Sequence, residues 1–399
     1  MSNFENNNPI DKSRLASRLA DIDSFFVVDF ITRAKALEDD GRSIVNLAVG
    51  EPDFETPEPI VKAGIEALKI NSIRYTPSLG GDALRKKISN WYRTKYGVNI
   101  SASRVAVTSG SSAGLLLVMG VLLSPKDEVL MADPGYPCNR HIVRAMEGRT
   151  KSVPVGPDTG YQLTADLIKE HWTANTVAAI VASPSNPTGT LVSQEEMKRM
   201  HSVVEDKGGS LIVDEIYHGL TFGIDAKTAL EFTQNVFVIN SFSKYFGMTG
   251  WRLGWVIAPE LFINEIEKLA QNLYISNSDV AQQAALAAFD PQTTAIAEKN
   301  RKQYGEQREY LLPRLKDMGF IIPVDPKGAF YIYADCSGFT NDSYAFCLDL
   351  LESAGVAIAP GLDFGSYRAN QHIRFSYTKP ISVLGEGLDR LKKHLKRIK

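Results

Sequence analysis

Between residues 104 and 287, short apolar runs alternate with stretches of helical periodicity. The runs are rich in valine and isoleucine and too short for helices, which is typical of strands buried on both faces. Strands that alternate with helices predict an α/β fold, a mostly parallel sheet covered by helices on both sides. The predicted strands are 105–107, 128–131, 177–181, 211–213, 236–239 and 255–257.

A second pattern begins where this alternation stops, near Ala287. A long helical stretch follows from Pro291, and later apolar runs predict strands at 319–324, 329–333, 356–358 and 373–375 among further helices. We therefore expect two domains. The large domain is expected over residues 50–290, and a smaller α+β domain from both chain ends, 1–49 and 291–399, with residues 1–12 disordered.

Composition excludes several classes of function. The 399-residue chain has a formal net charge of -2 and no basic patch, which argues against nucleic acid and anionic membranes as partners. It has no apolar run of membrane-spanning length, and its N-terminus lacks the apolar core of a signal peptide, so we expect a cytoplasmic protein. The three cysteines have no CxxC spacing, which predicts neither a disulfide framework nor a metal site.

Polar residues gather where the predicted strands end, and open α/β sheets bind their ligands at that edge. Thr108–Gly114 joins a strand to an apolar helix, and the free N–H groups at that helix start, with nearby hydroxyls, suit a phosphate. Asn186 lies between two prolines in a rigid turn. Asp214 ends a buried strand, where an unpaired carboxylate is costly, and Tyr217 follows it closely.

The stretch 240–259 adds two cations to this inventory. Lys244 comes just after a predicted strand, and Arg252 lies among glycines. With the acid, the tyrosine, the asparagine and the phosphate loop, they suit a phosphorylated aromatic cofactor that carries an aldehyde. A lysine amine forms a Schiff base with an aldehyde, and a carboxylate keeps a pyridine nitrogen protonated. Pyridoxal 5'-phosphate fits best, although the residues alone leave other cofactors open.

The glycine-serine loop also allows a different class of enzyme. Residues 110–114 fit the G-x-S-x-G nucleophile elbow, so a serine hydrolase using Ser112, Asp214 and His372 is an alternative. Such an enzyme would leave Lys244 and Arg252 without a role, and no HGGG-type oxyanion segment precedes the loop. The residues therefore favour the cofactor over the hydrolase.

Three motifs together resemble those of the class I/II aminotransferases, which are fold-type I pyridoxal-phosphate-dependent enzymes. They are S-F-S-K over 241–244 followed by Arg252, N-P-T-G over 186–189, and D-E-I-Y over 214–217. The resemblance implies a seven-stranded sheet in the large domain, with the cofactor joined to Lys244. It also implies catalytic roles for Lys244, Asp214 and Tyr217. The implied cofactor site further includes Gly110, Ser111, Ser112, Tyr136, Asn186, Ile216, Ser241, Ser243 and Arg252.

The resemblance also implies the substrates and a partner. Arg374 matches the arginine that grips the substrate α-carboxylate, and Gly50 and Asn186 line the same end of the site. Tyr75 matches a tyrosine that family members lend across a homodimer interface to the partner's cofactor phosphate. The implied reaction moves an amino group from an L-amino acid to a 2-oxo acid by a ping-pong mechanism.

The donor is the least constrained part of the predicted function. The helix after the phosphate loop is wholly apolar, and Arg144 and Lys327 are weak candidates for binding a second carboxylate. We therefore expect a neutral or aromatic donor more than aspartate. The same residues would also serve a C–S or other lyase, because the cofactor supplies the chemistry. A transcription regulator is disfavoured, since the N-terminal segment has no room for a helix-turn-helix domain.

Overall fold

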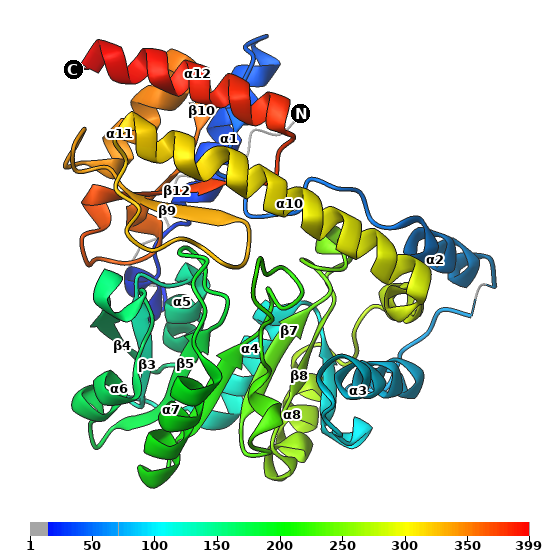
Figure 1. The fold of residues 1–399 in the computed structure, drawn as a ribbon. Coiled ribbons are helices and arrows are strands. Elements are labelled where there is room, and N and C mark those ends of the chain that lie inside the picture. Colours follow the sequence, from blue (N-terminus) through cyan, green and yellow to red (C-terminus); the bar gives the residue numbers. More distant parts are fainter. Residues whose placement is uncertain (1–14, 71, 399) are drawn as a thin grey trace, which may run out of the picture.

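The computed structural model describes residues 15–70 and 72–398; the disorder expected for residues 1–12 concerns a segment outside these ranges. A seven-stranded sheet with the order β2-β8-β7-β6-β5-β3-β4 forms its centre (Figure 1). Only β8 runs antiparallel to its neighbours, so the predicted mostly parallel sheet is confirmed. The strands are β2 (Val105–Thr108), β3 (Glu128–Asp133), β4 (Arg149–Pro154), β5 (Thr176–Ala182), β6 (Ser210–Asp214), β7 (Phe237–Ser241) and β8 (Gly254–Ile257).

Each face of this sheet has its own apolar core, because side chains alternate along a strand. Ile212 of β6 belongs to the core that includes residues of α4 and α8, whereas Leu211 and Val213 belong to the core of α6 and α7. The helices around the sheet are α3 (Asp82–Tyr96), α4 (Ser111–Leu122), α5 (Pro137–Ala145), α6 (Ala165–His171), α7 (Gln194–Asp206) and α8 (Glu260–Leu273). Beside α3, α2 (Glu58–Ile70) packs on α9 (Asp279–Ala285).

One strand of the sheet was missed by the sequence patterns. β4 lies at the edge next to β3 and has the sequence RTKSVP, in which Val153 is the buried residue. An edge strand that faces solvent needs few apolar residues, so β4 lacks the apolar run by which the other strands were found. The six predicted strands are all present, and β4 completes the sheet.

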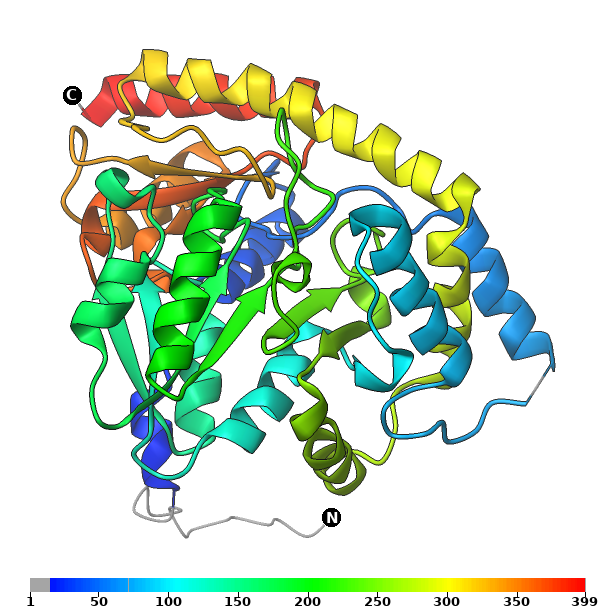
Figure 2. The same cartoon turned by 60° about the horizontal axis from the view of Figure 1, so that its bottom comes forward.

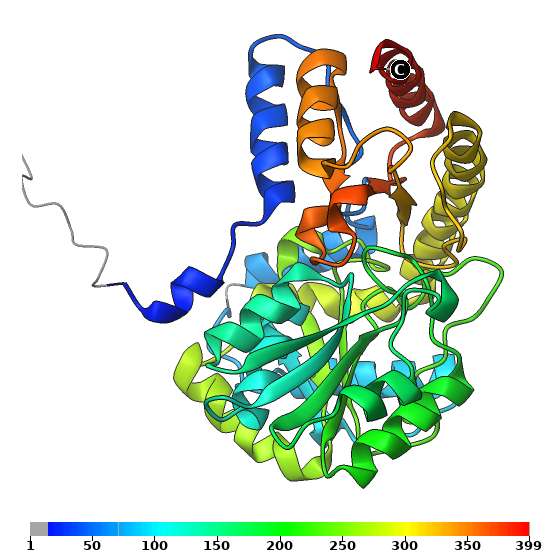
Figure 3. The same ribbon diagram turned by 90° about the vertical axis from the view of Figure 1, so that its left-hand side faces the viewer.

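Two smaller sheets lie beside the main one (Figure 3). β9 (Tyr331–Asp335), β12 (His372–Ser376) and β11 (Ala359–Pro360) form an antiparallel sheet, and β1 (Val45–Asn46) pairs in parallel with β10 (Val356–Ala357). The β1–β10 pair joins segments from opposite ends of the chain. The helices packed around these sheets are α1 (Phe26–Asp39), α11 (Ser343–Asp349) and α12 (Ile381–Ile398).

The strand expected at 319–324 is wrong. Gly319 has a left-handed φ of 103° and ends the preceding helix, and Ile321 makes only an isolated bridge to Asp335. Pro323 has no backbone N–H to donate to a neighbouring strand, so pairing does not extend along this segment.

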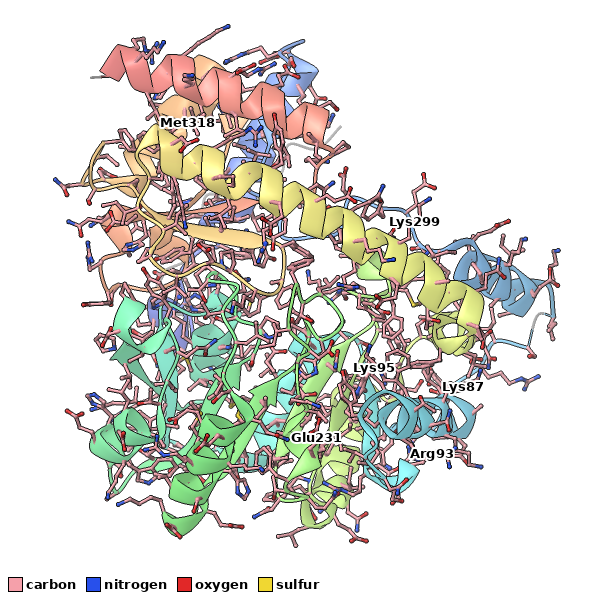
Figure 4. The ribbon with its side chains drawn as sticks, in the orientation of Figure 1. Lys87, Arg93, Lys95, Glu231, Lys299 and Met318 are labelled. Atoms are coloured by element: carbon pink, nitrogen blue, oxygen red, sulfur yellow. The ribbon has the colours of Figure 1, made fainter. Side chains whose placement is uncertain are left out.

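The helix α10 (Pro291–Met318) runs from α2 at one end to α12 at the other (Figure 2). Figure 4 labels Met318, the last residue of α10, and Lys87, a residue of α3 that lies near the start of α10. The Lys87 ammonium bonds Asp290, the residue before the helix, at 2.9 Å. Among the described residues, no helix combines the length and apolar composition that crossing a membrane requires.

Candidate active site

A cavity of about 270 Å³ opens at the carboxyl ends of the parallel strands, where Ala182 ends β5 and Asp214 ends β6. Most of the residues predicted for the site line this one cavity. They are Gly50, Ser111, Ser112, Tyr136, Asn186, Asp214, Ile216, Tyr217, Ser243, Lys244, Arg252 and Arg374. Segments far apart in the sequence thus meet where the sheet topology predicts a ligand site.

The start of α4 forms a cradle for an anion. Gly110 has a left-handed φ of 83°, and a Cβ at this position would come within 2.5 Å of Arg252 Nη2. Glycine therefore allows both the backbone turn and the approach of the guanidinium. Ser241 Oγ donates to Ser243 Oγ at 2.8 Å, which places two hydroxyls in the loop that carries this arginine. Free N–H groups at a helix start beside a cation are suited to a phosphate.

Lys244 reaches into the cavity from the segment after β7. Its Nζ donates to the backbone oxygen of Gly50 at 2.6 Å and lies 5.9 Å from the ring centre of Tyr217. Burial, helped by the cations of Arg374 and Arg252, lowers the pKa of Lys244 to about 8, although the charge of Glu51 opposes this shift. A lysine with a lowered pKa has a larger uncharged fraction at neutral pH, which makes it a better nucleophile and base.

Asp214 faces Lys244 from the end of β6. Its carboxylate accepts a hydrogen bond from the backbone N–H of Ile216 at 3.0 Å, and burial raises its pKa to about 6. The Ile216 bond and the Lys244 charge both favour the ionised form. Tyr217 and Tyr331 join their hydroxyls at 2.8 Å, and burial holds the pKa of Tyr217 well above its usual range. The site therefore offers one buried acid and a pair of protonated phenols.

Arg374 is almost completely buried in β12 and points to the same cavity. Its Nη1 donates to Asn186 Oδ1 at 2.9 Å, and its Nη2 donates to the backbone oxygen of Ala48 at 2.6 Å. The guanidinium lies 4.2 Å from the ring centre of Tyr331 and 4.8 Å from that of Phe364. Its Nε has no hydrogen-bond partner. A fixed guanidinium with unused donors is suited to a carboxylate.

A neutral acid–imidazole pair lies behind Asp214. Glu215 is fully buried and accepts hydrogen bonds from Thr228 Oγ1 and the Ala229 N–H, both at 2.9 Å. Its other oxygen lies 3.4 Å from His218 Nδ1 without making a hydrogen bond of good geometry. Burial raises the pKa of Glu215 to about 8 and lowers that of His218 to about 3. At neutral pH the pair is therefore uncharged and adds no second anion beside Asp214.

Three predicted site residues lie outside the cavity lining. Gly110 and Ser241 stand just behind it, through their contacts with Arg252 and Ser243. Tyr75 lies between α2 and α3 with 81% of its surface exposed. Its predicted role needs a second chain, so the single chain leaves that role open.

The serine hydrolase is not assembled. Ser112 and Asp214 line the cavity, but His372 does not. The imidazole of His372 stacks on Tyr333 at 4.7 Å, and its Nδ1 bonds the backbone oxygen of Arg368. His372 is therefore held in the small sheet, away from the cavity, and does not act as the general base that a Ser112 nucleophile would need.

Neither candidate for binding a second carboxylate lines the cavity. Arg144 bonds Asp21 at 2.7 Å on α5, and Lys327 lies in the segment before β9. Within the described part of the chain, the cations of the lining are Lys244, Arg252 and Arg374.

The sequence patterns missed an apolar wall of the cavity. It consists of Phe25, Val27, Val28 and Ile31, at the start of α1, and we call these residues the apolar wall. Their helical spacing is visible in the sequence, but periodicity does not tell whether an apolar face packs on a core or lines a ligand site. Val28 is half exposed, which distinguishes it from a core position.

The fold and the cavity together define a class of enzyme that binds a phosphorylated ligand at the edge of a mostly parallel sheet and holds a carboxylate nearby. Residues 42–391 match the family described as aminotransferase class I and II. The chain belongs to this family, and it is an aminotransferase. The family implies pyridoxal phosphate as cofactor and amino acids and 2-oxo acids as substrates.

Several known proteins resemble this chain over nearly its whole length. Valine–pyruvate aminotransferase of Mycobacterium tuberculosis is 39% identical, covering 95% of this chain and 97% of that protein. The (5-formylfuran-3-yl)methyl phosphate transaminase of Methanocaldococcus jannaschii is 36% identical, covering 96% and 100%. The crystal structure of an aminotransferase from Mycobacterium tuberculosis has a TM-score of 0.93 at 38% identity, covering 96% and 99% of the two chains.

Proposed function

We propose that this aminotransferase uses pyridoxal 5'-phosphate to move the amino group of a neutral, aliphatic or aromatic L-amino acid to a 2-oxo acid. The observation that carries the proposal is the lining of one cavity. It combines a lysine of lowered pKa, a buried acid, an anion cradle and a carboxylate-binding arginine with the apolar wall. It has no further cation, among the described residues, for the side chain of an acidic donor.

The residues present fit the cofactor. The loop at Gly110 with Arg252 is a cradle that a Cβ would fill, which suits the phosphate. Asp214 is buried and ready to bond a protonated ring nitrogen, while Asn186 and Tyr217 offer donors for the ring oxygen. Tyr136 and Ile216 line the cavity and supply flat and apolar surfaces for the two ring faces. Lys244 would hold the cofactor covalently.

Pyridoxal phosphate, when bound, supplies an aldehyde for the donor amine and a ring that accepts electrons. Lys244 Nζ would take the proton from the donor Cα and deliver it to the cofactor carbon that carries the amine nitrogen, a task that its pKa of about 8 suits near neutral pH. Arg374 orients the donor through its α-carboxylate, with the guanidinium fixed by Asn186 and Ala48. Asp214 keeps its negative charge toward the ring nitrogen.

The apolar wall supports a donor with an aliphatic or aromatic side chain. Val27 is 4% exposed and packs into the core, whereas Val28 is 50% exposed, so the wall presents hydrocarbon at the cavity mouth. An aliphatic or aromatic side chain gains from burial there, and a second carboxylate would be desolvated without a partner. The relative named a valine–pyruvate aminotransferase fits such a donor.

We further propose a homodimer. Tyr75 is exposed, and so are Ile70, Ile73 and Ile275; Ser78 Oγ donates to the Ile275 oxygen at 2.5 Å, which joins the segment of Tyr75 to that of Ile275. A second copy of the chain would cover these side chains and receive Tyr75 near its phosphate cradle. The division into a large domain over 50–290 and a small domain from 1–49 and 291–399 remains a prediction, as does the cytoplasmic location.

The test is a donor panel. The purified protein with pyridoxal phosphate is mixed with single amino acids and pyruvate, and the 2-oxo acid formed from each donor is measured. Valine, leucine or phenylalanine should exceed aspartate. Ammonia or a cleaved side chain, instead of a 2-oxo acid with an equimolar amino acid, would identify a lyase. Faster turnover of aspartate than of every neutral donor would refute the proposed donor class.

A further inference from the structure

One short segment after β11 contacts both the Tyr136 loop and α1. We call residues 361–367 the bridging segment. Its Phe364 oxygen accepts a hydrogen bond from the Gly135 N–H at 2.7 Å, next to Tyr136. Its Ser366 donates to Asp133 through the backbone N–H at 3.0 Å and through Oγ at 2.9 Å. The bridging segment is thus fixed to the end of β3.

The same segment caps α1 through Asp363. This side chain is 1% exposed, and its two oxygens accept hydrogen bonds from consecutive backbone N–H groups, Phe26 at 2.8 Å and Val27 at 2.7 Å. Phe25, at the N-cap position of α1, makes no side-chain cap bond of its own. A helix start leaves its first N–H groups unpaired, so Asp363 supplies from more than 330 residues away what the local sequence lacks.

One of the two residues that Asp363 bonds belongs to the apolar wall. Val27 is bonded directly, and Phe25 and Val28 are its near neighbours in the chain. The segment that carries Asp363 also carries Phe364, whose ring lies 4.8 Å from the Arg374 guanidinium. A single short segment therefore contacts both the arginine that would bind the donor carboxylate and the wall that would meet the donor side chain.

We infer that Asp363 is a positioning residue for donor selectivity: by capping α1 it holds the apolar wall in place over the donor side chain. This inference rests on the proposed function, because it assumes an apolar donor in the cavity. A carboxylate suits the task because it presents two acceptor oxygens to adjacent N–H groups and places negative charge at a helix start. Arg140 Nη2 fixes the same residue by donating to its backbone oxygen at 2.9 Å.

The substitution Asp363→Asn tests the role of these two hydrogen bonds with little change in side-chain size. An amide has one acceptor oxygen and turns an NH₂ group toward the second N–H, so one of the two bonds is lost. We expect the KM for leucine to rise and the preference for leucine over alanine in kcat/KM to fall about tenfold, the lower end of what one buried methylene contributes to discrimination. The kcat with alanine should stay near wild type, because alanine does not reach the wall.

Asp342→Asn is the matched control. Asp342 also caps a helix, α11, but it accepts a single bond from the nearby Ala345 N–H at 2.9 Å, is exposed and does not line the cavity. The variant Asp342→Asn should leave the preference for leucine over alanine unchanged. Val28→Ala provides a second variant that shortens the half-exposed wall without touching Asp363, and it should lower the same preference. An unchanged preference in Val28→Ala would overturn the inference even if Asp363→Asn does not fold.

Hydrogen exchange gives a readout that does not need activity. The amides of Phe26 and Val27 should exchange at least about tenfold faster in Asp363→Asn than in wild type, and at the wild-type rate in Asp342→Asn. Unchanged exchange and unchanged selectivity in an active Asp363→Asn would overturn this inference alone. Failure of the wild type to transaminate any donor would instead overturn the proposed function, and the selectivity claim with it.

Discussion

Replacement of Arg374 by lysine tests the carboxylate site with the charge kept. Two N–H groups of the guanidinium are already used, on Asn186 Oδ1 and the Ala48 oxygen, and Nη1 and Nη2 each keep a second N–H for a ligand. A lysine ammonium has too few donors to keep both of these bonds and still hold a carboxylate by two. The variant should therefore lose about one charge-assisted hydrogen bond to the donor, roughly 1.5–3 kcal/mol.

This loss corresponds to a fall of roughly 10- to 150-fold in kcat/KM, at about 1.4 kcal/mol for each factor of ten. The assay is steady-state kinetics with a neutral donor, beside an unfolding curve to show that the variant is folded. Arg104→Lys is the matched control, because Arg104 is also buried and bonds the Ala258 and Gln234 oxygens, away from the cavity. A fall of less than about threefold in Arg374→Lys, or an equal fall in Arg104→Lys, would refute the reasoning.

Three other outcomes are expected. Lys244→Ala should fold yet show no visible absorbance band of covalently held pyridoxal phosphate, and wild-type transamination by this variant would contradict the assignment. Because the pKa of Lys244 in the folded, cofactor-free protein is about 8, below its ordinary 10.5, the unfolded chain binds more protons between these values. The free energy of unfolding should therefore rise with pH through that window, and less so in Lys244→Ala. Gly110→Ala should weaken pyridoxal phosphate binding at least about tenfold in a fluorescence titration, because the added Cβ meets Arg252. Gly97→Ala is the control: this glycine is also left-handed but has open space around it, so its replacement should leave cofactor binding unchanged.

The sequence was sufficient for the parts of the fold and site that rest on local signals. Continuous apolar runs locate six strands, and the rule that ligands bind at strand ends places Asp214, Asn186 and Lys244 at one edge of the sheet. The structure brings these three residues together in one cavity at that edge. The polar edge strand β4 and the false strand at 319–324 mark the limit of the same method, because local composition does not reveal sheet edges or unpaired segments.

Other features depend on contacts between distant segments, and no local pattern predicts them. Asp363 and Phe26 are 337 residues apart, and nothing in the sequence around Asp363 indicates that it caps this helix. Glu215 stands beside Asp214 in a motif of the family, yet its uncharged state follows from complete burial against His218. The apolar wall also depends on contacts between distant segments, because the sequence shows the apolar face of a helix but not what that face contacts.

The cations of the cavity link the basicity of Lys244 to its proposed ligands. Arg252 and Arg374 each lower the pKa of its ammonium, and burial lowers it most. Under the proposed function each arginine receives an anion from a ligand, a phosphate in the cradle of Arg252 or a carboxylate beside Arg374. Under the proposed function, binding of these anions would offset the charges of the two arginines, so the amine would become a stronger base when a donor is present to give up its proton. Before these anions bind, the same arginines keep more of the lysine uncharged, which favours its reaction with an aldehyde.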